Sequence, residues 1–262
     1  MEHTVPLIVR QVCLACNDLE RTSGMVRAVF GIEHAYSDPD MGQLGVRNEV
    51  LALGTDYLEL ISPVDEHAPA SRFLKRQGEG GYMVICQVDS LASQTKIRQR
   101  GADLGIRTVL DRNHRDANYL QWHPSDLGGT MLDTAFDHRA EFTGRWDPAG
   151  GAPGEYSTNR LPLRLVKVGI TCLDPRATAQ TWAAITLGEV ALDSTQRPFL
   201  HLDNTDLYFL PPDDRFSQPR LSRIHVASSE TARILDNARN LGLDVYGSRF
   251  ALCGVEFTVS GD

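Results

Sequence analysis

The sequence has no apolar run long enough to cross a membrane. Its longest apolar stretches, Val50 to Leu53 and Val166 to Cys172, fall far short of the roughly 20 residues that a spanning helix needs. Near the N-terminus, Arg10 and Gln11 interrupt the only apolar stretch, so the pattern of a signal peptide is missing. We therefore expect a cytoplasmic protein that does not contact membranes.

A tract of basic residues is also missing. The formal net charge is -8, and charged residues of both signs are scattered along the chain. Such a surface repels the phosphates of nucleic acids and anionic lipids. We expect no nucleic-acid partner.

Cysteine is scarce, and its number is odd. Four of the five cysteines lie in apolar, strand-like runs, which is typical of reduced, buried thiols rather than of a disulfide framework. Cys13 and Cys16 have the spacing of a redox motif, but in a strand an offset of three places the two thiols on opposite faces. We therefore do not interpret the pair as redox-active.

What the sequence does contain is a repeat. Four apolar, β-rich runs begin near Arg10, Tyr82, Val166 and Ser222, and each ends in a residue that can cap a helix. Helical periodicity follows each run, and a glycine follows each helix as an expected stop. These expected helices are 19–30, 91–100, 175–187 and 231–241, with Gly31, Gly101, Gly188 and Gly242 behind them.

Strand signals follow each glycine. In the first repeat they cover 32–37, 47–53 and 57–62, with 54–56 as a turn. In the second repeat they cover 107–110, 119–123 and 131–136. In the third repeat they cover 189–192, 199–202 and 206–210. The fourth repeat is expected to be cut short. The unit is therefore a βαβββ module, and the fold class is α+β.

The domain division follows from composition. With 262 residues, of which 42% are hydrophobic, the chain can bury two cores. Residues 140–159 are rich in Gly and Pro and show little periodicity, so we interpret them as a linker between domains 1–139 and 160–262. A smaller connector, 64–80, is expected to hold one helix over 71–77.

Three segments carry a family resemblance: Asp56 to Pro63, Phe73 to Val88 and Tyr119 to Asp133. They resemble the vicinal oxygen chelate superfamily of glyoxalases, bleomycin-resistance proteins and extradiol dioxygenases, and within it the methylmalonyl-CoA epimerases. The resemblance implies that paired modules curl into two half-open barrel domains. It is strongest in the N-terminal half, where the more complete site is expected, and the C-terminal half matches by module pattern alone.

The resemblance also implies positions for a divalent metal such as Mg, Mn, Co or Zn. These positions are Gln11, Glu59, Met83 and Asp133 here, and their spacing repeats between the modules. Gln11, Glu59 and Asp133 offer oxygen ligands, but Met83 stands where relatives place a histidine, and a thioether does not suit hard cations. We favour a site without metal, and we expect no nucleotide cofactor.

Without a metal, Glu59 and Asp133 are predicted to act as a general acid/base pair, because carboxyls that share a low-dielectric pocket have raised pKa values. The alternative is that hydrogen bonds from Gln11, Gln87 or Tyr82 make them purely structural. His123 is a third catalytic candidate, or else a turn histidine. The expected substrate-binding residues are Gln11, Tyr82, Met83, Gln87, Tyr119 and Trp122.

The corresponding positions of the C-terminal half hold Lys167, Tyr208, Arg223 and Glu256. This set cannot supply the two histidines and one glutamate that hold iron in an extradiol dioxygenase, so we disfavour that function. Lys167 and Arg223 could bind an anionic group or belong to a structural ion-pair network with Glu256, and we favour the network.

The predicted function is that of an isomerase, epimerase or lyase that removes a proton next to a carbonyl. Its substrate is expected to be a small oxygenated organic molecule or an acyl thioester. The alternative is a non-catalytic small-molecule-binding protein of the same fold, similar to bleomycin-resistance proteins. A homodimer is left open.

Overall fold

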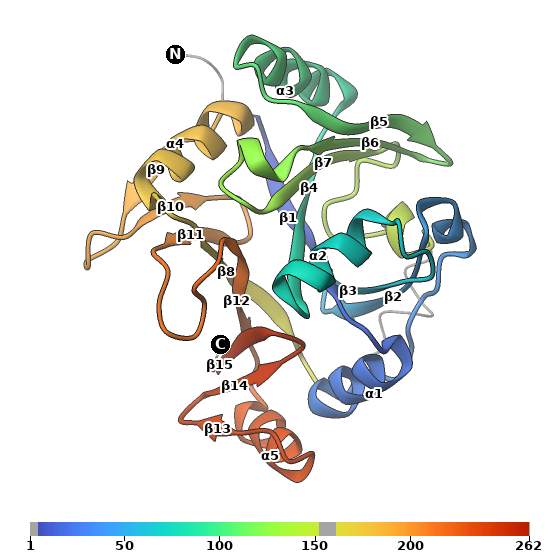
Figure 1. Cartoon of the computed structure of the whole chain (residues 1–262), viewed down its shortest axis with the longest axis vertical. Coiled ribbons are helices and arrows are strands. Elements are labelled where there is room, and N and C mark those ends of the chain that lie inside the picture. Colours follow the sequence, from blue (N-terminus) through green and yellow to red (C-terminus); the bar gives the residue numbers. More distant parts are fainter. Residues whose placement is uncertain (1–4, 152–160, 262) are drawn as a thin grey trace.

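Four modules follow one another in the computed structural model, which describes residues 5–151 and 161–261 (Figure 1). The first two form the N-terminal barrel, with β1 (Leu7–Ala15), α1 (Leu19–Phe30), β2 (Val46–Leu53), β3 (Asp56–Pro63), β4 (Gly80–Val88), α3 (Leu91–Asp103), β5 (Thr108–His114), β6 (Ala117–Trp122) and β7 (Met131–Asp137). The last two form the C-terminal barrel, with β8 (Arg164–Thr171), α4 (Pro175–Thr186), β9 (Val190–Leu192), β10 (Pro198–His201), β11 (Asp206–Leu210), β12 (Arg220–Ala227), α5 (Thr231–Asn240), β13 (Val245–Tyr246), β14 (Arg249–Leu252) and β15 (Val255–Ser260). The predicted α+β fold of tandem modules is confirmed.

Strand pairing follows one rule in all four modules. The first strand of each module pairs in parallel with its last strand, as β1 with β3, β4 with β7, β8 with β11, and β12 with β15. Within each barrel the two first strands pair antiparallel, β1 with β4 and β8 with β12. In each barrel, the first and last strands of its two modules therefore form an equivalent group of four. The two first strands lie at the centre of this group.

Local sequence signals explain where the helices begin and end. The side chain of Asp18 accepts a hydrogen bond from the backbone of Arg21 at the start of α1, and Asp174 does the same for Ala177 at the start of α4. Gly31 ends α1 with a φ of 65°, a left-handed conformation that glycine adopts without strain. The expected bounds 19–30 are therefore observed unchanged.

Three expectations about the modules were wrong. Residues 32–37 do not form a strand: they make isolated bridges at Ile32 and at Tyr36, the latter to Val50, before the chain forms a 3₁₀ helix, η1 (Pro39–Leu44). Gly101 does not end α3, which continues to Asp103, because this glycine lets the helix pack against the ring of Trp122. The fourth module is not cut short, since β13, β14 and β15 are all present.

The helices and the backs of the sheets share one core that runs through both barrels. α1 packs against α5, and α3 packs against α4, so helices of different halves lie in contact at two places (Figure 1). A second, smaller apolar cluster lies inside the N-terminal barrel. Cys13 belongs to this inner cluster and Cys16 to the shared core, which confirms that the two thiols lie on opposite faces. All five cysteines are buried and free.

A seam of close backbone contacts joins the two barrels. Gly81 on β4 pairs with Leu221 on β12, and an added Cβ at Gly81 would lie 2.1 Å from the Leu221 carbonyl oxygen. Beside it, the Arg220 guanidinium donates to the carbonyl oxygen of Glu79 at 2.6 Å. The turn at Gly254 also contacts the Glu79 backbone. At positions 81 and 254, therefore, only glycine fits.

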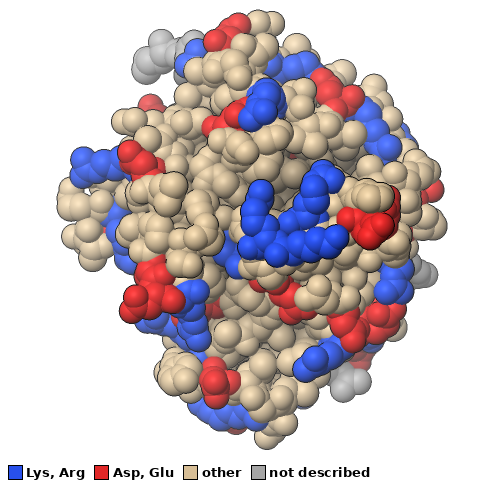
Figure 2. Space-filling model, viewed as in Figure 1, with Lys and Arg blue, Asp and Glu red and all other residues tan. Residues whose placement is uncertain are grey.

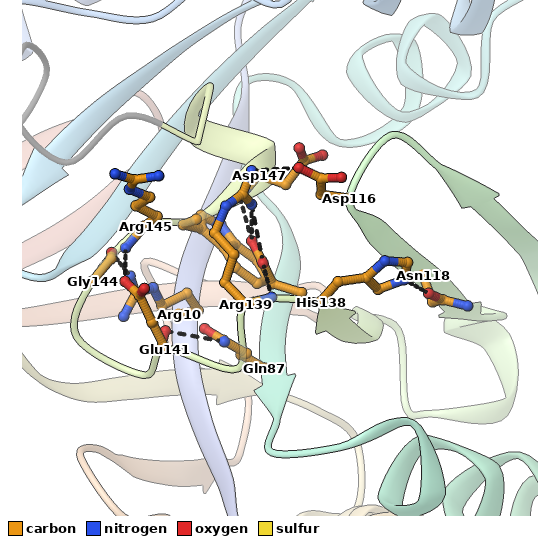
Figure 3. Close-up of polar contacts among 12 residues, drawn as sticks. Arg10, Gln87, Asp116, Asn118, His138, Arg139, Glu141, Gly144, Arg145 and Asp147 are labelled. Carbon is orange, nitrogen blue, oxygen red and sulfur yellow. Dashed lines mark hydrogen bonds and ion pairs between the residues drawn. The ribbon is translucent and has the colours of Figure 1, made fainter.

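The segment after β7 folds back against the N-terminal barrel (Figure 3). The carbonyl oxygen of Glu141 accepts a hydrogen bond from Gln87 Nε2 at 3.1 Å, and that of Gly144 accepts one from Arg10. Trp146 is buried inside the barrel. Residues 141–151 of the expected linker thus form a wall of this barrel, and 152–160 lie outside the described residues. The division at 1–139 and 160–262 stays a prediction.

None of the helices in the described part of the chain is both long and apolar enough to cross a membrane. The connector between the first two modules holds α2 (Pro69–Gln77), close to the expected 71–77. Figure 2 shows Lys and Arg side chains gathered over this helix, whose exposed cations are Arg72, Lys75 and Arg76.

Gly24→Ala is expected to raise the free energy of unfolding by about 0.5–1 kcal/mol, because glycine in a helix interior is less favourable than alanine by about that amount. Gly24 is exposed within α1, and an added Cβ would meet nothing within 4 Å. Urea unfolding measures the change. The matched control is Gly101→Ala, where the new Cβ would lie 2.2 Å from the Trp122 ring and should destabilise the protein. If both variants changed the free energy of unfolding in the same direction, this account would be wrong.

Candidate active site

The concave face of the N-terminal barrel encloses a small cavity of about 70 Å³. Four residues that the family resemblance implied line it together: Gln11 on β1, Glu59 on β3, Met83 on β4 and Asp133 on β7. Tyr119, predicted to bind substrate, lines it as well. The structure therefore brings the central positions of both modules to one place.

Glu59 is buried and held by two side-chain amides. Its carboxylate accepts hydrogen bonds from Gln11 Nε2 at 2.9 Å and from Asn48 Nδ2 at 2.8 Å. The Gln11 amide oxygen in turn accepts from the Trp146 indole at 2.8 Å, and because an indole can only donate, it fixes which end of the amide faces Glu59. Burial raises the pKa of Glu59, and the hydrogen bonds offset part of that rise.

Asp133 is the equivalent carboxyl of the second module. It accepts hydrogen bonds from Gln121 Nε2 at 3.1 Å and from the backbone N–H of Leu120 at 3.3 Å. Burial raises the pKa of Asp133 to about 7, and the charge of Glu59 adds to the rise. A carboxyl with this pKa exchanges its proton near neutral pH, as a general acid or base must.

The two carboxyls flank the cavity from opposite sides. The strand order β3, β1, β4, β7 places Glu59 and Asp133 on the outer strands of this group of four. Both carboxyls therefore line the cavity, from the strands that lie on either side of β1 and β4.

The residues of the cavity do not fit a divalent metal. Each carboxylate oxygen of Glu59 already faces an amide N–H, which a cation would repel, and the Gln11 oxygen is occupied by the indole of Trp146. Met83 contributes a thioether, which is a poor ligand for hard cations. Among residues 5–151 and 161–261, no three His, Cys, Asp or Glu side chains gather as a metal site. We therefore derive no chemistry through a metal.

A cation of the protein itself lines the cavity instead. Arg112 on β5 belongs to the lining, and its Nε is buried without a hydrogen-bond partner in the described part of the chain. No carboxylate of the described residues forms an ion pair with it. Its guanidinium is thus free to bind an oxygen atom of a ligand.

A cluster of ion pairs lies beside the cavity, whose lining includes Asp38, Asp40 and His114. At the tip of the β5–β6 hairpin, Arg115 reaches across to η1, where it binds Asp38 at 2.8 Å and also Asp40. His114 contacts the same Asp40 at 3.2 Å.

Other predicted site residues lie away from the cavity. His123 accepts a hydrogen bond from the backbone of Ser125 and contacts Arg107, in agreement with the turn alternative. Trp122 lies in the shared core behind the sheet, where its indole N–H donates a hydrogen bond to the Thr134 hydroxyl. Tyr82 and Gln87 do not line the cavity either. The ring of Tyr82 packs against that of Phe73, and Gln87 donates a hydrogen bond to the Glu141 carbonyl oxygen.

Three functional candidates were missed: Asn48, Arg112 and Trp146. Asn48 had a signal, since it is a polar residue on the same face of β2 as the apolar Val46 and Val50. Arg112 had none, because the sequence of β5 is polar at most positions. Trp146 lay in a segment that composition marked as a linker.

The chain has relatives among known proteins. Residues 12–186 match the family model of the Glyoxalase-like domain. The chain is 26% identical over 129 residues to mitochondrial methylmalonyl-CoA epimerase of Mus musculus, which covers 48% of this chain and 70% of that protein. It is also 26% identical over 127 residues to ethylmalonyl-CoA/methylmalonyl-CoA epimerase of Cereibacter sphaeroides, covering 48% and 94%.

A solved structure of a hypothetical protein from Staphylococcus aureus matches 97% of this chain and 99% of that chain, with a TM-score of 0.63 and 10% identity. This likeness shows that the fold of both halves together recurs elsewhere. The family model covers more than half of the chain. The protein therefore belongs to the Glyoxalase-like domain family of the vicinal oxygen chelate superfamily.

Proposed function

We propose that the N-terminal barrel is an epimerase-type isomerase that moves a proton at a carbon next to a carbonyl. The observation that carries this proposal is the placement of Glu59 and Asp133, two buried carboxyls with raised pKa values, on opposite sides of one cavity. Inversion of a carbon centre needs a base on one face and an acid on the other, and this arrangement supplies both.

The reaction balances with groups of the chain alone. The Glu59 carboxylate takes the proton, and the electron pair of the C–H bond moves onto the carbonyl oxygen to give an enolate. Protonated Asp133 then donates its proton to the opposite face of the carbon, and the carbonyl forms again. In the reverse direction, the two carboxyls exchange roles.

Arg112 supports this proposal because the enolate oxygen needs a positive partner. In metal-dependent members of the superfamily a cation would supply it, whereas here the unpaired guanidinium lines the same cavity. A charged donor aimed at a developing oxyanion typically contributes two to three orders of magnitude in rate.

The substrate class follows from the cavity and from the relatives. The cavity of about 70 Å³ admits only a small carbonyl-bearing group, so any larger part of the substrate must lie outside it. The curated relatives are named as epimerases of methylmalonyl-CoA, which supports an acyl thioester whose acyl group enters the barrel.

The test is deuterium wash-in, followed by proton NMR, over acyl-CoA thioesters that include methylmalonyl-CoA and over 2-oxo acids. We expect exchange at the carbon next to the carbonyl of at least one compound, with the same rate after dialysis against EDTA. If no compound exchanges, the epimerase proposal is wrong. Binding without exchange would instead support the alternative of a non-catalytic binding protein, and release of a leaving group would indicate a lyase.

Arg112→Met is expected to lower the exchange rate about 100-fold to 1000-fold, because the variant keeps the length of the side chain and loses the charge that faces the enolate. The same NMR assay measures it. The matched control is Arg98→Met, which removes an arginine paired with Asp111 outside the cavity. Equal effects of the two variants would contradict the assigned role of Arg112.

A further inference from the structure

The C-terminal barrel contains a cavity of its own, and it is much larger than that of the N-terminal barrel. Its volume is about 490 Å³, within the range of about 300–1,000 Å³ that small-molecule sites occupy. The floor comes from the inner faces of β8, β11, β12 and β15, and the β11–β12 loop forms one side. The positions that correspond to Gln11, Glu59 and Met83 hold Lys167, Tyr208 and Arg223 here.

The charge of this cavity is positive. Four cations line it, Lys167, Arg197, Arg223 and Arg249, against two carboxylates, Asp213 and Glu256. This excess of two positive charges stands in a chain whose net charge is -8. Local charge of the opposite sign to the whole molecule favours an anionic ligand.

The carboxylates are already neutralised by the protein. Glu256 lies 2.5 Å from Arg215, 3.6 Å from Arg223 and 3.8 Å from Arg249. This confirms the predicted pairing of Arg223 with Glu256. Asp213 forms a second ion pair with Arg223. Three guanidiniums around one carboxylate leave positive charge that the network does not balance.

Two lining cations lie outside this network: Arg197, which pairs with Asp193 at 2.8 Å, and Lys167. In the stretches that the structure describes, no carboxylate lies within ion-pairing distance of it, and its ammonium lies 5.2 Å from the centre of the Tyr208 ring. Lys167 on β8 is the register partner of His225 on β12, two residues beyond Arg223. The ammonium and the Arg223 guanidinium therefore reach the cavity from adjacent strands.

The remaining lining suits the body of an organic molecule. The Tyr208 ring stacks on Phe199 at 5.0 Å and thereby stays fixed as a flat apolar surface. Burial and the charge of Lys167 lower the pKa of His225, and the Nε2 atom of this imidazole contacts Ser260 Oγ at 2.8 Å. Gly169, at the centre of the floor, has no side chain to fill the space.

We propose that the C-terminal barrel binds a small organic carboxylate, with the carboxylate received by Lys167 and Arg223 and its apolar body against Tyr208. The site is separate from the carboxyl pair of the N-terminal barrel and has the opposite charge. It gives the second half of the chain a ligand-binding role.

Isothermal titration calorimetry at low ionic strength tests the proposal with defined probes: benzoate and phthalate as organic carboxylates, phenyl phosphate and inorganic phosphate as other anions, and benzamide as the neutral analogue. We expect saturable binding of benzoate or phthalate at one site per chain, and no binding of benzamide. Inorganic phosphate binding as tightly as the organic carboxylates would overturn the role of Tyr208 and the organic body.

Lys167→Met is expected to weaken binding of the carboxylate at least tenfold and Lys167→Arg to retain it, since the charge is the recognised feature. Lys75→Met is the matched control, because Lys75 belongs to the exposed basic group over α2 (Figure 2) and lines neither barrel. Glu59→Gln should also leave binding unchanged, which separates this site from the proposed epimerase. The proposal is overturned if no carboxylate binds, or if Lys167→Met and Lys75→Met bind equally well. Thermal unfolding of Lys167→Met verifies that the variant is folded.

Discussion

Asp133→Asn is expected to lower the rate of proton exchange at least 100-fold and at the same time to stabilise the folded protein at pH 8. The loss of rate follows from the removal of the group that donates the proton, since a positioned acid or base typically contributes two to four orders of magnitude. Glu59→Gln should lose exchange to a similar extent, because the proton needs both carboxyls to cross from one face to the other.

The gain in stability follows from the raised pKa of Asp133, which is about 7 in the folded protein against 3.8 for the ordinary group. A raised pKa means that folding disfavours the ionised form. The stabilising effect of the protonated form is therefore complete below pH 4 and is lost as the pH rises to about 7. Asparagine carries no charge, so we expect a gain of about 1–2 kcal/mol at pH 8 after the loss of charged hydrogen bonds, and little difference at pH 4.

The pH profile of the wild-type exchange rate adds a second readout. The proposed reaction needs one proton shared between the two carboxyls, and the pair titrates as a unit. Once the pH exceeds about 7, Asp133 is ionised and has no proton to donate. The rate should therefore fall above this pH.

Urea unfolding at pH 4 and pH 8, together with NMR exchange assays, measures these effects. Asp111→Asn is the matched control, because Asp111 on β5 is exposed and pairs with Arg98 outside the cavity. If Asp133→Asn destabilises the protein at pH 8 and leaves the exchange rate within threefold of wild type, Asp133 is a structural residue.

Gly81→Val is expected to lower the free energy of unfolding by about 3 kcal/mol or more. An added Cβ would lie 2.1 Å from the Leu221 carbonyl oxygen and 2.5 Å from its Cβ, and neither atom can move without parting β4 from β12. Since Arg220 and Gly254 make their contacts next to this point, the damage should spread along the whole seam.

Because the seam links the barrels, we also expect the unfolding curve of Gly81→Val to separate into two transitions. Gly24→Val is the matched control: it introduces the same side chain on α1, where nothing lies within 4 Å. Urea unfolding followed by tryptophan fluorescence distinguishes the variants. A single transition within about 1 kcal/mol of wild type would show that the seam does not hold the halves together.

The sequence predicted the modules because their boundaries depend on local chemistry. Asp18 and Gly31 cap α1 through contacts a few residues away, and such signals are visible without a structure. The expected strand at 32–37 was wrong because a strand needs a partner, and the edge of β2 is reached only at Tyr36. Gly101 was misread for a similar reason, since its contact with Trp122 is a tertiary one.

The contrast between signals visible in the sequence and contacts that arise only in the fold also applies to the candidate site. The resemblance pointed to Gln11, Glu59, Met83 and Asp133, and these residues line one cavity because they occupy equivalent inward positions of the two modules. It could not find Arg112, which reaches the cavity from an edge strand without an equivalent in the first module.

Because residues 141–151 pack against the N-terminal barrel, they decide where a fragment containing this barrel alone should end. A fragment that stops at residue 139 ends before Trp146, so the Gln11 amide would lose the indole that orients it, and Arg10 and Gln87 would lose their backbone acceptors. Three buried polar side chains would then each lack a hydrogen-bond partner. A fragment extended to residue 151 retains these contacts, and it is the smaller unit in which the proposed chemistry should be sought.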